Sequence, residues 1–78
     1  MDKRLVRIFE LVFLLNQKGR NLQLNLGKNA IYVLDANCRN IIPYWTRCIY
    51  FDKYWKNDYD EMVKGTLEML ETMFKEEI

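Results

Sequence analysis

Residues 21–26 read Asn-Leu-Gln-Leu-Asn-Leu, a strict alternation of polar and apolar side chains. Because successive side chains of a strand point to opposite faces of a sheet, this pattern predicts a strand with one solvated face. The composition of residues 30–35 predicts a second strand. A third is expected within residues 41–51, where Pro43 marks the start of the strand or an edge position, because proline has no N–H to donate.

The loop between the first two strands sets how they pair. Gly27 and Lys28 predict a tight hairpin. A two-residue loop at these positions pairs Leu24 with Ile31 and leaves Tyr32 on the outer face of the sheet. One additional loop residue would reverse this assignment of faces.

Helical periodicity flanks the strands. Apolar side chains recur at spacings of three and four in residues 3–18, between Asp2 as a candidate N-cap and Gly19 as a candidate C-terminal residue. The segment that follows Asp58 has the same spacing, and Asp58 begins a capping-box variant. The predicted fold class is therefore α+β, one small domain over residues 1–78. Its order is α-β-β-β-α, with two helices packed on one face of a three-stranded antiparallel meander.

The net charge is only +1, but the charges are unevenly distributed. Residues 1–20 carry five basic groups against two acidic ones, whereas residues 58–78 carry seven acidic groups against two basic ones. The sequence therefore predicts that the two ends attract each other. The alternative is that they present oppositely charged faces to partners.

The composition argues against catalysis. The chain has no histidine and no serine, so it lacks the usual general base and every serine–histidine or cysteine–histidine pair. Its three glycines form no phosphate-binding loop. Cys38 and Cys48 match no zinc-binding spacing and are expected to be free thiols. We therefore predict no enzyme activity, no cofactor and no metal.

The N-terminal segment resembles the start of a secretory leader only superficially. Its apolar run, Leu11–Leu15, has five residues and no small-residue cleavage site follows it. A membrane-spanning helix needs about 20 apolar residues. The sequence therefore predicts a soluble, cytoplasmic protein that does not enter a membrane.

The most distinctive feature is a cluster of aromatic residues in which charged residues are interleaved. Seven of the eleven aromatic residues lie within residues 44–59. Tyrosine and tryptophan are enriched at binding hot spots, which predicts an interaction surface, although some of these rings are needed to fill the core of a small domain. The candidate protein-binding residues come from this cluster and from the last helix, which contributes two glutamates. They are Tyr50, Lys53, Tyr54, Trp55, Lys56, Glu68 and Glu71.

These features favour a non-catalytic protein-binding module, a small inhibitor or adaptor that acts by steric occlusion. The expected partner is another protein, such as a nucleic-acid-handling complex, because an acidic helix can compete for a site that holds phosphates. A small size and a composition rich in Asn, Lys, Ile and Tyr are typical of accessory proteins of phages and other mobile elements. Anti-CRISPR inhibitors are the subclass that this hypothesis names first.

Two alternatives remain open at this point. One is a nucleic-acid-binding protein that uses basic residues of the first helix, which are Lys3, Arg4, Arg7, Lys18 and Arg20. The α-β-β-β-α order is similar to that of double-stranded-RNA-binding domains. That family has a lysine-rich motif at the start of its last helix, where this chain has Asp58, Asp60 and Glu61. The other alternative is a homo-oligomeric structural protein that pairs through the edge of its third strand.

Overall fold

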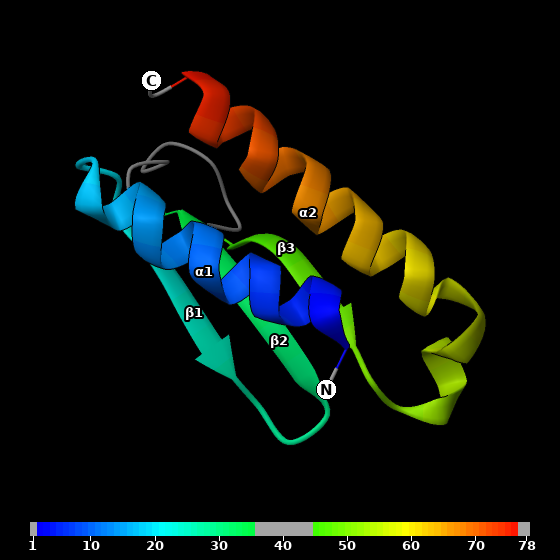
Figure 1. The fold of residues 1–78 in the computed structure, drawn as a ribbon. Coiled ribbons are helices and arrows are strands. Elements are labelled where there is room, and N and C mark those ends of the chain that lie inside the picture. Colours follow the sequence, from blue (N-terminus) through cyan, green and yellow to red (C-terminus); the bar gives the residue numbers. More distant parts are fainter. Residues whose placement is uncertain (1, 36–44, 77–78) are drawn as a thin grey trace.

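The computed structural model describes residues 2–35 and 45–76, with the side chains of 45 and 46 left aside. Its elements are α1 (Lys3–Gln17), β1 (Leu22–Leu26), β2 (Ala30–Asp35), β3 (Trp45–Tyr50), a 3-10 helix η1 (Lys53–Asp58) and α2 (Tyr59–Glu76). The strands form one antiparallel sheet in the order β1-β2-β3 (Figure 1). Both helices lie side by side on one face of this sheet, which confirms the predicted fold class.

The ends of α1 confirm the predicted caps. The Asp2 carboxylate accepts a hydrogen bond from the Arg4 backbone N–H at 2.9 Å, as an N-cap does. At the other end Gly19 has a φ of 101°, in the left-handed region that favours glycine. Helix α1 therefore begins and ends where its sequence provides hydrogen-bond partners for the terminal backbone groups.

The register of the first hairpin differs from the prediction by two residues. Leu24 pairs with Val33 rather than with Ile31, and the Gly27 N–H donates to the Ala30 carbonyl at 2.8 Å. Gly27 and Ala30 thus face each other, and the loop lies one position later along the chain than predicted. Because side chains alternate with a period of two, this shift leaves every face unchanged. Ile31 and Val33 are buried beneath the helices, as the alternation predicts.

Strand β3 lies at one edge of the sheet. Ile49 pairs with Ile31 and is fully buried, whereas Arg47 has the same orientation but remains exposed. The pairing of β2 with β3 is irregular between Val33 and Leu34. Val33 pairs with Arg47 and Leu34 with Trp45, so β3 contains one additional residue at this point. Pro43 and Cys38, predicted to mark the start or edge of the third strand and to be a free thiol, lie outside the described residues.

The core lies between the helices and the sheet. Helix α1 packs on β1 and on α2, and α2 packs on β3. The buried apolar side chains come from both of these helices and from all three strands. They are Leu5, Ile8, Leu11, Val12, Leu15, Leu22, Ile31, Val33, Ile49, Val63 and Leu70. Within the described ranges, neither helix is long and apolar enough to cross a membrane.

The segment before α2 differs from the prediction. Asp58, the predicted N-cap, is the last residue of the 3-10 helix η1. The cap lies six residues earlier, where the Asp52 carboxylate accepts a hydrogen bond from the Tyr54 N–H at 3.0 Å. An earlier aspartate therefore starts the helical segment, and the predicted capping box is wrong. This early start determines the geometry of the candidate site.

Candidate functional site

The turn geometry of η1 aligns two lysines and a tyrosine. In a 3-10 helix the side chains at positions i and i+3 eclipse each other. Lys53 and Lys56 therefore share one side of η1, and the next position in this series is Tyr59, the first residue of α2. All three line the same depression.

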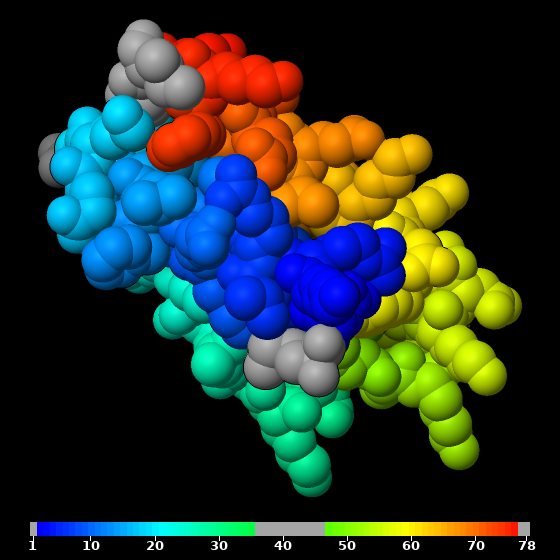
Figure 2. All heavy atoms as spheres, viewed as in Figure 1, coloured from blue at the N-terminus to red at the C-terminus, as the bar shows by residue number. Residues whose placement is uncertain are grey.

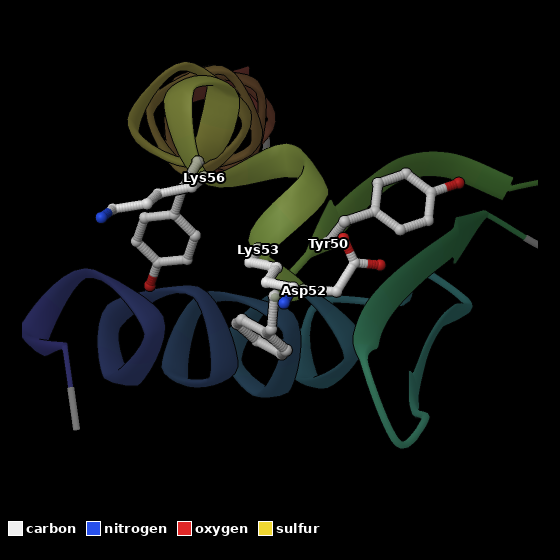
Figure 3. Close-up of a pocket in the computed structure, with 6 residues that line it drawn as sticks. Tyr50, Asp52, Lys53 and Lys56 are labelled. Carbon is white, nitrogen blue, oxygen red and sulfur yellow. The ribbon is translucent and has the colours of Figure 1, made fainter.

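This depression lies where β3 leads into η1 and has a volume of about 400 Å³. Figure 3 shows Lys56 projecting to one side of it and Tyr50 to the other, with Asp52 and Lys53 between them. Three aromatic rings and two amines make it both apolar and cationic. The complete lining is Tyr50, Phe51, Asp52, Lys53, Lys56 and Tyr59.

Trp55 packs against two further aromatic rings, Tyr50 in the lining of the depression and Tyr54. The Tyr50 and Trp55 rings stack with centroids 5.0 Å apart and an interplanar angle of 20°. Tyr54 meets the edge of Trp55 at 5.6 Å and 69°, yet 85% of Tyr54 is exposed. These contacts hold the rings in favourable aromatic geometries without burying them in the core. Figure 2 shows the yellow-green segment that includes η1 projecting from the body of the molecule.

The first turn of α1 holds Tyr59 in place. The Tyr59 hydroxyl donates to Asp2 Oδ2 at 3.1 Å, and the Arg4 guanidinium carbon lies 5.8 Å from the centre of the Tyr59 ring. Hydrogen bonds from the Arg4 side chain, and to a smaller extent from its backbone N–H, lower the pKa of Asp2 from 3.8 to about 2. Burial raises the pKa of Tyr59, and its hydrogen bond to Asp2 raises that pKa further. The site therefore includes an ionised carboxylate and a neutral phenol near neutral pH.

The charged groups of this region are not equally neutralised. Arg4 forms ion pairs with Asp2 and Asp60, each at 2.8 Å. No ion pair joins Lys53 or Lys56 to any carboxylate of the residues that the structure describes. The two lysines of the depression therefore have charge available for a ligand.

The two predicted glutamates lie apart from this surface. Glu71 accepts a hydrogen bond from Arg7 Nε at 2.9 Å, so it forms an ion pair between α2 and α1. Glu68 is exposed along a second, shallower depression that Arg47 and Gly65 also line. The structure thus brings together five of the seven predicted residues and separates Glu68 and Glu71 from them.

The predicted attraction between the two ends of the chain is confirmed. Arg4 contacts Asp60, and Arg7 contacts both Glu71 and Glu10. Hydrogen bonds to Asp2 and then to Asp60 raise the pKa of Arg4, and hydrogen bonds to Glu71 and then to Glu10 raise the pKa of Arg7. The arginines at the start of α1 are therefore engaged within the protein.

Sequence reasoning did not assign Phe51, Asp52 and Tyr59 to the site. The signal for Tyr59 was its spacing of three from Lys56, which has a structural meaning only if the preceding residues form a 3-10 helix. Asp52 was detectable as a cap from its residue type, because an aspartate side chain can accept a hydrogen bond from the backbone N–H two residues later, here that of Tyr54. Phe51 carried no signal beyond its aromatic neighbours.

The described residues offer no other obvious chemistry. Within residues 2–35 and 45–76, no three His, Cys, Asp or Glu side chains gather closely enough to hold a metal ion. Cys48 is a free thiol, and its interaction with Tyr50 raises the pKa of that tyrosine.

Comparisons with known proteins leave the geometry of the site as the basis for a functional proposal. No protein-family model, curated protein or solved structure matches the chain at a significant level.

Proposed function

We propose that the chain is a non-catalytic protein-binding module and that it binds through one aromatic and basic patch. This patch consists of Tyr50, Lys53, Tyr54, Trp55 and Lys56. The observation that carries the proposal is the exposure of Tyr54, which is 85% accessible while its ring rests against Trp55. An exposed aromatic ring that is already positioned loses little conformational freedom on binding. Tyrosine and tryptophan are also the residue types that dominate binding hot spots.

The positions of the arginines favour this surface over a nucleic-acid site on α1. Arg4 and Arg7 contact carboxylates, and Arg20 Nη1 lies 3.9 Å from Asp35 Oδ2. Phosphate binding through α1 would require these ion pairs to be exchanged for phosphate contacts. Lys3 and Lys18 form no ion pair with another described residue, but Lys18 Nζ lies 5.5 Å from the centre of the Phe74 ring. The two lysines of the patch also form no ion pair within the described part of the chain, and exposed aromatic rings lie next to them.

Packing of α2 on β3 also favours the patch over pairing of two β3 edges. Two antiparallel β3 strands would lie about 4.8 Å apart. The α2 helices above them need about 8–10 Å between their axes. With α2 packed on β3 in each copy, the two α2 helices would therefore compete for the space that strand pairing requires.

The finer proposal is a small inhibitor or adaptor that occludes a partner's surface. A nucleic-acid-handling complex in the cytoplasm is the proposed setting, and the free Cys48 thiol suits a reducing compartment. The assignment to phage or other mobile-element proteins, with anti-CRISPR inhibitors as the leading subclass, rests on size and composition alone.

A capture experiment with matched variants tests the proposal. The tagged chain is incubated with lysate of candidate host cells, with and without nuclease, and bound proteins are identified. Tyr54→Ala should reduce affinity for the captured protein about 30-fold, since a hot-spot aromatic contributes about 2 kcal/mol or more. Phe13→Ala is the control, because Phe13 is an exposed aromatic residue of α1 that lies outside the patch.

The outcomes distinguish the hypotheses. A protein that survives nuclease treatment, binds the Phe13 variant and loses affinity for the Tyr54 variant supports the proposal. Capture that disappears with nuclease would instead indicate a nucleic-acid ligand. Equal binding to the Tyr54 and Phe13 variants would show that the patch is not the binding surface.

A further inference from the structure

We infer that the depression, which shares Tyr50, Lys53 and Lys56 with the patch, binds an extended acidic segment of the partner, in the pattern acidic-x-acidic-x-apolar. This inference rests on the proposed protein-binding function and deepens it by assigning a chemical class to the partner. The three ligand positions would meet Lys53, Lys56 and Tyr59 in order. All three residues line one depression, and they follow one another at a spacing of three along the helical segment.

The spacing of the three residues matches an extended peptide. A 3-10 helix rises about 2.0 Å per residue, so residues three apart are separated by about 6 Å along the axis. In an extended chain, residues two apart point to the same side and are separated by about 6.6 Å. Alternate ligand side chains therefore align with Lys53, Lys56 and the adjacent Tyr59.

The charges determine the chemical type at the first two positions. Lys53 and Lys56 are exposed and form no ion pair with another described residue, whereas Arg4 and Arg7 are engaged by carboxylates. The remaining charged group of the lining is Asp52, and its carboxylate accepts the Tyr54 N–H as a cap. Two carboxylates of a ligand would neutralise the two lysines.

The aromatic lining determines the third position. The Phe51 and Tyr59 rings lie 6.1 Å apart at 43°, and both line the depression. Tyr59 is held from behind by Asp2, so its ring is fixed before a ligand arrives. A phenylalanine or leucine side chain would bury apolar area against these rings.

A protein segment fits this site better than a nucleic acid does. A polyanion needs a row of cations, because each bound phosphate displaces counterions. Here the lysines are flanked by exposed Asp58 and Asp60, which would repel a continuing phosphate backbone. A ligand with only two carboxylates and one apolar anchor avoids this repulsion.

Amide NMR of the isotope-labelled full chain tests the inference with a defined probe. The probe is the capped peptide Glu-Ser-Glu-Ser-Phe, and the control peptide, Ser-Glu-Glu-Ser-Phe, has the same composition but adjacent glutamates. The probe should shift amide signals within residues 50–59 and bind more tightly than the control. Equal affinity for both peptides would overturn the inferred spacing.

Charge-reversal variants provide the second arm. Lys53→Glu with Lys56→Glu should weaken probe binding about tenfold, the change expected when two exposed ion pairs are lost. Lys64→Glu with Lys75→Glu makes the same change in net charge on the exposed side of α2 and should leave binding unchanged. Equal effects of the two double variants would show attraction to the whole protein and would refute the site.

An oligothymidine titration provides the last arm. Tighter binding of this oligonucleotide than of the probe, with shifts within residues 50–59, would refute the peptide assignment. The result also separates this inference from the proposed function. If Tyr54→Ala abolishes capture of a partner but the lysine reversals do not affect probe binding, the binding module stands and the acidic-peptide inference fails.

Discussion

Replacing Gly65 with alanine should stabilise the protein, although Gly65 lies against another side chain in the middle of α2. Glycine in a helix interior costs about 1 kcal/mol relative to alanine. A Cβ placed on Gly65 would lie 3.5 Å from Arg47 Nη1 and 3.7 Å from Arg47 Cζ, both ordinary van der Waals distances. Because the neighbour is the far end of a flexible side chain, the propensity gain of about 1 kcal/mol should be retained. The midpoint of thermal unfolding should rise by about 4–8 °C.

Urea and thermal unfolding of Gly65→Ala and Gly19→Ala provide the measurement and its control. Gly19 has open space around it but a φ of 101°, so alanine there should destabilise the protein by about 1–2 kcal/mol. The same chemical change is thus expected to have opposite signs at two positions. Destabilisation by Gly65→Ala would show that Arg47 cannot move aside, and would refute the reasoning about this contact.

Two further predictions concern α1. The Asn16 side chain donates a hydrogen bond to the Leu22 carbonyl at 2.9 Å and accepts one from the Leu22 N–H at 2.8 Å. Asn16→Ala should therefore lower the free energy of unfolding, measured in urea, by about 1–3 kcal/mol. No measurable change would show that water replaces both bonds. The pKa of Asp2 is lowered from 3.8 to about 2. The ionised carboxylate therefore stabilises the folded state above a pH of about 4, and this stabilisation is lost as the pH falls through about 2. The stability difference between wild type and Asp2→Asn, which retains a capping side chain, should therefore shrink from pH 4 to pH 2; a constant difference would contradict the assignment.

The sequence predicts the faces of the elements well because burial repeats with a fixed period. Apolar residues at spacings of three and four identify the buried side of α1, where Ile8, Leu11 and Leu15 are fully buried. In β2 the alternation identifies Ile31 and Val33 as inward-facing. The helix caps follow from residue types whose side chains or backbone conformations suit helix ends.

The pairing register was not determined by the same information. A shift by two residues keeps all leucines of β1 on the same face of the sheet, so the hydrophobic pattern fits both registers. The choice depends on whether Gly27 and Ala30 join the ladder, which they do through the Gly27 N–H. That bond depends on loop conformation rather than on hydrophobic patterning.

The candidate site was predicted by composition but not by geometry. An aromatic cluster with Lys53 and Lys56 is visible in the sequence, whereas their alignment with Tyr59 requires a 3-10 helix there. The acidic face of α2 was expected to contribute Glu71. Its engagement by Arg7 depends on the packing of α1 beside α2, which the local sequence does not specify.

Because no residue of η1 is buried, the site depends on its few anchoring contacts rather than on the core. Asp52 caps the helix, Trp55 stacks on Tyr50, and Asp2 holds Tyr59 from a position 57 residues away in the chain. An element with so little burial is drawn from the low-stability end of the structure, so these anchors reduce the ordering that a ligand must supply. The start of α1 therefore contributes to the free energy of binding by holding Tyr59 in place, although it lies outside the patch. Loosening Tyr59 at Asp2 would weaken recognition while leaving every lysine in place.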